Sequence, residues 1–211
     1  MRWFSVMTLL ACLGCSANGQ DISLPQPVKT GGMPLLDALS KRASCREFSV
    51  RKPDLQTLSN LLWAACGINR EDGRRTVPSA LNMQETSVYV MLETGVYRYD
   101  ETKNLLILVH AGDHRRLTGS QEYTHAVPVT LFFVADLDML KISNPAEEHK
   151  MAYANASAGF IGQNVYLFAA ANGMAAVFRA SIDREELAKC FRLSPSQRVL
   201  YAQSVGYPEA R

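Results

Sequence analysis

One long helical stretch constrains this fold more than any other feature of the sequence. It runs from Glu147 to Asn172 and is rich in alanine. From Ala158 onward, apolar residues fall on nearly every side of the predicted helix instead of along one stripe. Gly173 ends the stretch. Because such a helix needs cover on all sides, we expect it to lie in the core of a domain or of a dimer.

The composition is that of an ordinary globular chain. Of the 211 residues, 47% are hydrophobic and 20% are charged, which excludes a disordered, collagen-like or coiled-coil protein. Lys and Arg number 22 against 20 acidic residues, for a formal net charge of +2. This balance gives no electrostatic reason to expect a nucleic-acid partner, so any anion site must be local.

The N-terminus has the pattern of an export signal. Met1-Arg2 precedes an apolar run, Trp3–Gly14, which is too short to span a bilayer. Two endings remain open: a signal peptide over residues 1–19, or a lipoprotein signal ending at Cys12 or Cys15, where the cysteine would carry a lipid anchor. We therefore expect an exported protein, periplasmic or lipid-anchored to a bacterial membrane.

The rest of the chain reads as one α+β domain. Residues 20–33 carry two prolines and a Gly-Gly pair and are interpreted as an extended lead-in without an element, followed by a domain over 34–211. Asp54 is the expected cap of a helix that stops at Gly67. Helices are also expected at 34–42 and 183–191, and strands at 86–92, 96–99, 105–109, 129–135, 174–178 and 198–205. Strands in the middle and helices at both ends predict a central, mostly antiparallel sheet flanked by helices.

Cysteine and histidine spacing predicts no metal site. Cys45, Cys66 and Cys190 are interpreted as small buried hydrophobic residues, with Cys45 the one thiol worth testing for reactivity. His110 and His114 flank Gly112 and Asp113 in an expected loop, where a solvated surface explains them better than a metal.

Arg42, Ser44 and Arg46 form a candidate anion site. Their i, i+2, i+4 spacing turns all three side chains to one face of an extended segment. Two guanidinium groups and a hydroxyl suit a phosphate monoester, which offers several acceptor oxygens and close to two negative charges. A solvated turn explains the same residues when they are taken alone.

Three segments, in this order, give the motif its context. They are Arg42-x-Ser44-x-Arg46-x-Phe48, then Pro78–Gln84, then Gly159–Leu167 continuing to Asn172-Gly173-Met174, and Gly206-Tyr207-Pro208 follows them. In order and spacing the chain resembles the nitroreductase superfamily of flavin mononucleotide (FMN) enzymes, over about Pro34–Pro208. The run Ala175–Arg179 and the short length are most similar to the dehydrogenase branch that includes SagB-type azoline oxidases.

The resemblance implies a nitroreductase-like fold in an intertwined homodimer, with an FMN at each of two sites between subunits. It implies that Arg42, Ser44 and Arg46 contact the phosphate and ribityl chain, with Arg211 as a second basic phosphate contact. It implies that Pro78, Ser79 and Asn82 reach the flavin from the partner subunit. The backbone around Arg179, Ala180 and Ser181 is expected to contact the central ring.

The implied activity is hydride transfer from a reduced donor such as NAD(P)H, through flavin N5, to an organic acceptor such as a nitroaromatic or quinone. Because the flavin carries that chemistry, no catalytic side chain and no metal are expected. An alternative from another class is a non-catalytic flavin-binding or scaffold subunit of an exported complex.

Overall fold

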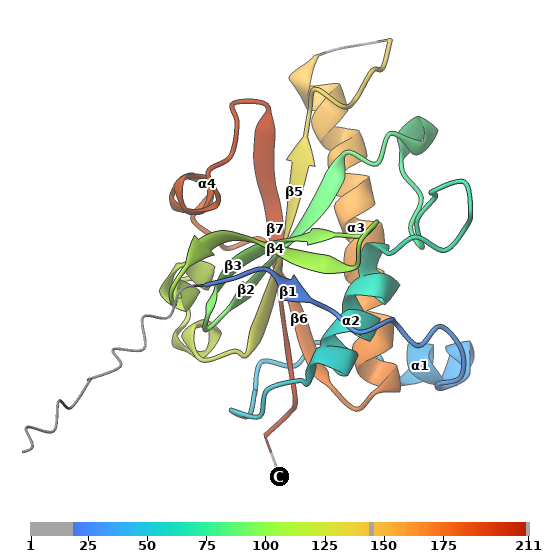
Figure 1. Ribbon diagram of the computed structural model, residues 1–211, viewed down its shortest axis with the longest axis vertical. Coiled ribbons are helices and arrows are strands. Elements are labelled where there is room, and N and C mark those ends of the chain that lie inside the picture. Colours follow the sequence, from blue (N-terminus) through green and yellow to red (C-terminus); the bar gives the residue numbers. More distant parts are fainter. Residues whose placement is uncertain (1–18, 144–145, 210–211) are drawn as a thin grey trace, which may run out of the picture.

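The computed structural model describes residues 19–143 and 146–209. Within these residues, seven strands form one sheet in the order β1-β4-β3-β2-β5-β7-β6, and all of the pairings are antiparallel (Figure 1). This architecture confirms the α+β class and the antiparallel sheet. The predicted signal sequence, with Cys12 and Cys15, and the predicted contact of Arg211 lie outside the described residues.

Most element bounds agree with the sequence pattern to within two residues. The strands are β1 (Ile22–Ser23), β2 (Thr86–Leu92), β3 (Gly95–Asp100), β4 (Leu105–Ala111), β5 (Val129–Asp136), β6 (Ala175–Arg179) and β7 (Gln197–Gly206). The α-helices are α1 (Leu35–Lys41), α2 (Leu55–Cys66), α3 (Glu147–Ala171) and α4 (Arg184–Phe191), and short 3-10 turns are η1 (Ala80–Asn82), η2 (Arg115–Thr118) and η3 (Glu122–His125).

The sheet separates two hydrophobic cores. Helices α1, α2 and α3 cover one face and α4 covers the other (Figure 1). Adjacent residues of β5 point to opposite faces, as the two-residue period of a strand requires. Phe133 packs in the larger core with Leu61 and Ile161, and Phe132 packs in the smaller core with Phe191 of α4.

Helix ends form where capping residues were expected. The Asp54 carboxylate accepts a hydrogen bond from the Thr57 N–H at the start of α2, and this bond lowers the pKa of Asp54. Gly67 ends the helix, and a Cβ at this position would lie 2.3 Å from the Trp63 ring. Asp183 caps α4 in the same way, by accepting from the Glu186 N–H at 3.0 Å.

The interpretation of residues 20–33 as a lead-in without an element is wrong at one point. Ile22 and Ser23 form β1, which pairs with Leu106 and Leu105 of β4, and Leu24 is buried in the larger core. A two-residue edge strand has no periodicity to detect, because its pairing depends on the exposed backbone of β4 and not on its own side chains.

Helix α3 confirms the predicted long helix but not its complete burial. Its buried residues include Ala154, Ala158, Ile161, Val165 and Ala169, which face the sheet. The opposite stripe stays exposed in the single chain and holds Ala152, Tyr153, Ala156, Gly159 and Phe160. The single chain therefore leaves an apolar stripe of its longest helix without cover.

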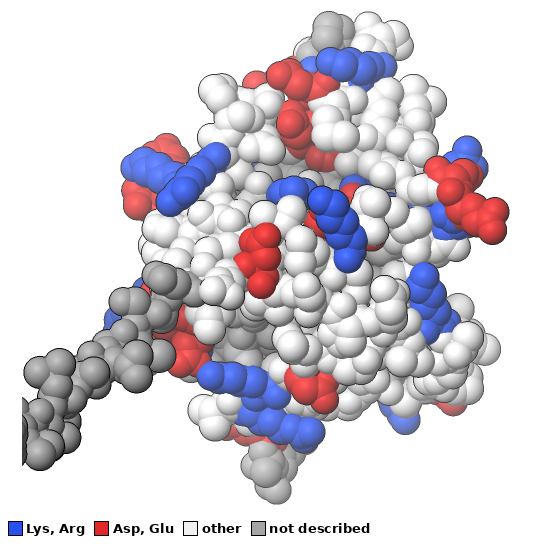
Figure 2. Space-filling view, in the orientation of Figure 1, with Lys and Arg blue, Asp and Glu red and all other residues white. Residues whose placement is uncertain are grey.

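Charged side chains form small groups of mixed sign on the face shown in Figure 2. The described chain also contains ion pairs, such as that of Asp113 with Arg115, whose hydrogen bonds lower the pKa of the Asp113 carboxyl. Among residues 19–143 and 146–209, no helix combines the length and apolar character needed to cross a bilayer.

Candidate active site

Tyr166 of α3 ties the Arg42–Arg46 segment to the end of strand β6. Its hydroxyl lies 2.8 Å from the Ser44 hydroxyl and accepts a 2.8 Å hydrogen bond from the Phe178 N–H. The Cys45 N–H also donates to the carbonyl of Ala176, at 2.9 Å. The segment therefore lies along the free edge of β6, which is the last strand of the sheet.

Two guanidinium groups on this segment are available to an anion. Arg42 and Arg46 are both exposed, and neither forms an ion pair within the part of the chain that the structure describes. The Arg42 guanidinium lies 5.4 Å from the centre of the Tyr166 ring, whose hydroxyl contacts the Ser44 hydroxyl. Arg42 and Ser44 thus both contact Tyr166, and Arg46 lies on the same short segment.

The free edge of β6 continues past Phe178 with unused backbone groups. In an antiparallel edge strand, the backbone N–H and C=O groups of alternate residues point away from the neighbouring strand. The backbone groups of Ala176, Phe178 and Ala180 therefore share the outward direction. The Ala176 carbonyl and the Phe178 N–H are bonded to Cys45 and Tyr166. Among the described residues, the next outward groups, the Phe178 carbonyl and the Ala180 N–H, have no partner. They offer an acceptor and a donor side by side.

Close packing of α3 fixes the position of this edge. A Cβ at Gly162 would lie 2.6 Å from two carbons of the Phe178 ring, so a glycine is needed where the helix crosses β6. The Phe178 ring packs 4.8 Å from the ring of Tyr201, centre to centre. Gln203 donates to the Gly162 carbonyl at 3.1 Å. These contacts fix the position of Phe178, whose carbonyl has no hydrogen-bond partner among the described residues.

The Arg179 side chain points away from the Arg42–Arg46 segment. Its guanidinium is buried and donates to the Thr118 carbonyl at 2.7 Å and to the Ser204 hydroxyl at 3.1 Å. Burial lowers the pKa of Arg179. Arg179, one of the predicted cofactor residues, therefore has only its backbone beside the candidate site.

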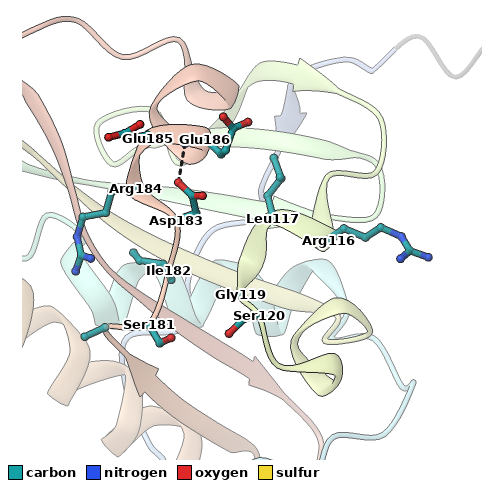
Figure 3. A pocket seen from close by; sticks show the side chains of 11 residues that line it. Arg116, Leu117, Gly119, Ser120, Ser181, Ile182, Asp183, Arg184, Glu185 and Glu186 are labelled. Atoms are coloured by element: carbon teal, nitrogen blue, oxygen red, sulfur yellow. Dashed lines mark hydrogen bonds between the residues drawn. The ribbon is translucent and has the colours of Figure 1, made fainter.

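Residues 180 and 181 also line a cleft on the α4 side of the sheet (Figure 3). Its volume is about 830 Å³, within the range of small-molecule sites. The opposite wall is η2 and the residues that follow it, including Gly119 and Ser120. The sequence gives no signal for this wall, because it is irregular backbone positioned by Arg179 and neighbouring loops.

The Pro78–Gln84 loop has a strained conformation. Leu81, Asn82 and Gln84 have positive φ angles of 49°, 56° and 51°, and Leu81 is 81% exposed. A bulky residue with left-handed backbone and an exposed side chain is unusual and costs energy. The Ser79 hydroxyl accepts from the Gln84 N–H at 2.9 Å, and the Asn82 amide oxygen accepts from the Gln84 side chain at 3.1 Å.

This loop is distant from the Arg42–Arg46 segment within one chain. A small cavity is lined by Pro78 and Ser79 together with Ser157 and Ile161 of α3. Ile161 and Ser157 lie five and nine residues before Tyr166, which contacts Ser44, so about 8 and 14 Å of helix axis separate them from it. The predicted cofactor residues therefore form two groups that the single chain does not join.

Cys45, the thiol singled out for reactivity, is half-buried, and its Sγ contacts the Glu47 carbonyl at 3.5 Å. Cys66 and Cys190 are buried, as expected, and burial raises the pKa of Cys66 to about 12. None of the three forms a disulfide within the described residues.

Comparison with known proteins identifies the family. The model of the Nitroreductase family matches residues 39–207, which includes both groups of site residues. The chain belongs to the nitroreductase family. The match confirms the superfamily and fold that the three sequence segments suggested.

Relatives support the same family. A candidate nitroreductase from Ralstonia eutropha has a crystal structure that is 36% identical, with a TM-score of 0.86 over 93% of this chain and 92% of that one. The candidate nitroreductase MJ1384 of Methanocaldococcus jannaschii is 29% identical over 68% of this chain and 76% of its own length. A candidate NADH oxidase from Clostridium acetobutylicum shares the fold at 22% identity, with a TM-score of 0.57 over 83% of this chain and 89% of that one.

Proposed function

We propose that this nitroreductase-family protein is an FMN-dependent oxidoreductase that passes electrons from a reduced nicotinamide donor to a small organic acceptor, such as a nitroaromatic or quinone. The observation that carries the proposal is the edge of β6. Two guanidinium groups without ion pairs in the described chain lie on the segment bonded to this edge, which ends in an unused carbonyl and amide.

The residues present fit FMN by the chemistry of their donors. Arg42 and Arg46 match a phosphate charge, and the Ser44 hydroxyl adds a donor or acceptor for the phosphate or the ribityl chain. The Phe178 carbonyl and the Ala180 N–H match a flat ring whose polar edge both donates and accepts. Bound FMN would supply the redox chemistry, taking a hydride at N5 from the donor and returning two electrons to the acceptor.

The protein's own part in this scheme is binding and orientation. Tyr166 fixes the Ser44 hydroxyl and the Phe178 N–H through one oxygen, so it aligns the phosphate segment with the ring edge. Gly162 lets α3 approach β6 closely enough for this contact. The cleft beside Ala180 and Ser181 is the candidate space for donor and acceptor.

A second subunit completes the proposed site. The exposed stripe of α3 and the exposed leucines of α1 form apolar surface that a second copy would cover. Leu81 projects from the strained loop that carries Pro78, Ser79 and Asn82. We place these three residues at the FMN of the partner subunit, in an intertwined homodimer, as the sequence resemblance implies.

The donor and the branch of the family are finer parts of the proposal. A neighbour of the same fold is named as an NADH oxidase, which makes NADH the first donor to test. The run Ala175–Arg179, which is similar to the SagB-type dehydrogenases, forms β6 and thus the proposed ring edge. Export, periplasmic or through a lipid on Cys12 or Cys15, stays a prediction of the N-terminal pattern.

The spectrum of the purified dimer tests the proposal. We expect the visible absorption of oxidised flavin, with about one FMN per chain, and loss of that absorption when NADH or NADPH is added without oxygen. A nitroaromatic or quinone should then restore it. A colourless dimer that cannot be reconstituted with FMN would contradict the proposal and favour the scaffold alternative.

A further inference from the structure

Three potential metal ligands meet on the α4 side of the sheet. His110 is the second-last residue of β4, His114 immediately precedes η2, and Cys190 lies in the last turn of α4. One ligand atom from each residue lies within 4.8 Å of the other two. The sequence predicted a solvated loop for the two histidines, because nothing in it places Cys190 beside them.

The distances are close to those of a tetrahedral zinc site. With bonds of about 2.0–2.1 Å to nitrogen and 2.3 Å to sulfur, tetrahedral Zn²⁺ holds its N and S ligands about 3.3–3.6 Å apart. The Nδ1 of His110 is 3.7 Å from the Sγ of Cys190. The His110 and His114 rings are 4.1 Å apart, centre to centre. The three ligand atoms lie within 4.8 Å of one another, so an adjustment of at most about 1.5 Å separates them from this geometry.

A backbone contact prepares His114 to act as a ligand. Its Nε2 lies 3.0 Å from the Ala111 carbonyl, and because a carbonyl oxygen only accepts, this nitrogen must carry the proton. The Nδ1 of the ring then keeps its lone pair. Histidine ligands of metals commonly donate their other N–H to a carbonyl in this way.

Among the described residues, no fourth histidine, cysteine or carboxylate joins the three ligands. Asp113 is the nearest carboxylate along the chain, but both of its oxygens accept from Arg115, at 2.9 Å and 2.7 Å. His110 and His114 are half-buried, so a cation has access from their side, while Cys190 is buried behind them. Three protein ligands with one open position leave room for a water molecule.

From this cluster we infer that His110, His114 and Cys190 bind one Zn²⁺ ion per chain, independently of the flavin. Imidazole nitrogen with thiolate sulfur is a donor set that selects zinc over magnesium or calcium. The ion would join the C-terminal turn of α4 to the end of β4. Because the first turn of α4 lines the cleft, bound zinc would also stabilise one wall of the proposed substrate space.

Titration of flavin-free protein with Co²⁺, a spectroscopic substitute for Zn²⁺, tests the site. We expect one Co²⁺ per chain, a thiolate-to-cobalt charge-transfer band, displacement by Zn²⁺, and a higher melting temperature with Zn²⁺. C190S should abolish the band. H114N should weaken binding at least tenfold, a cost typical of losing one ligand or its support.

Matched controls separate the site from general thiol binding. C66S removes a buried thiol in the other core, and H125N removes a half-buried histidine outside the cluster, so both should bind Co²⁺ like the wild type. If C190S misfolds, H114N still decides, because it changes a loop residue. No charge-transfer band in the wild type, or an unchanged titration in H114N, would overturn the inference and leave a thiol–imidazole hydrogen bond. The flavin spectrum is read separately, so either result is independent of the proposed enzyme.

Discussion

The two groups of site residues differ in how the chain holds them. The Arg42–Arg46 segment is bonded to the edge of β6 at Ala176 and, through Tyr166, at Phe178. The Pro78–Gln84 loop is held mainly by its own hydrogen bonds, in a left-handed conformation that exposes Leu81. We call the first group, the Arg42–Arg46 segment bonded to the edge of β6, the shelf. The second group is a loop that exposes Leu81 on the surface of the subunit. This difference is what we expect if, as proposed, a second subunit completes each site.

Removing the charges of the shelf should have the largest effect. In R42A/R46A, two charge-assisted contacts worth about 1.5–3 kcal/mol each are lost, so FMN affinity should fall roughly a hundred- to ten-thousandfold. The dissociation constant is measured by fluorescence as apo-protein is titrated into FMN. R74A removes an exposed arginine that pairs with Asp72 and should leave the constant unchanged. Unchanged FMN binding in R42A/R46A would contradict the proposal that Arg42 and Arg46 bind the phosphate.

The close approach of α3 to the shelf is tested by two glycines of the same helix. G162A places a Cβ 2.6 Å from the Phe178 ring and should cost about 1–3 kcal/mol of unfolding free energy, with weaker FMN binding. A Cβ at Gly159 meets nothing within 4 Å in the single chain, so G159A should stay within about 1 kcal/mol of the wild type unless the second subunit proposed to cover this stripe packs against it.

Urea denaturation of the two glycine variants gives the comparison. Equal stability of both would show that the Phe178 contact is not tight. A large loss confined to G159A would show instead that another subunit packs against that residue.

Tyrosine 166 tests the link within the shelf. Y166F removes the oxygen that contacts Ser44 and accepts from the Phe178 N–H, while it keeps the ring beneath Arg42. Because each of the two hydrogen bonds contributes about 0.5–1.5 kcal/mol and both are lost, FMN affinity should fall about fivefold to 150-fold. The same FMN titration measures it. An affinity equal to that of the wild type would mean that Tyr166 does not align the segment.

The smallest effect is expected from a substitution of Leu81, the exposed residue of the Pro78–Gln84 loop. Asn tolerates left-handed backbone better than Leu, so L81N should raise the stability of the isolated subunit by up to about 1 kcal/mol. Dimerisation should weaken, because an exposed apolar side chain is lost. Sedimentation at several concentrations measures the dimer. Tighter association of L81N would contradict a role for this side chain at the interface.

The parts of the molecule that sequence predicted are those set by local chemistry. Asp54 and Gly67 bound α2 as expected, because a cap depends on a few neighbouring residues. Arg42 and Ser44, two residues apart on one short segment, both contact Tyr166. Each of these signals lies within about a dozen residues.

The parts that sequence missed depend on distant contacts. Pairing of β1 with β4, the wall of the cleft, and the approach of Cys190 to His110 join residues about 60 to 80 positions apart. Neither partner carries a signal for the other. The free Phe178 carbonyl and Ala180 N–H at the edge of β6 were missed for the same reason. They can be identified only when the hydrogen-bond partners of Ala176 and Phe178 are known.

The central claim, that each site is shared between two subunits, is tested most directly by mixing defective chains. R42A/R46A and N82D, carrying different affinity tags, should each lose FMN binding as homodimers. Half of the dimers that form after equal mixing are heterodimers, and each should hold one intact site, which restores about a quarter of the wild-type FMN content. Purified heterodimers that bind no FMN would contradict the shared site.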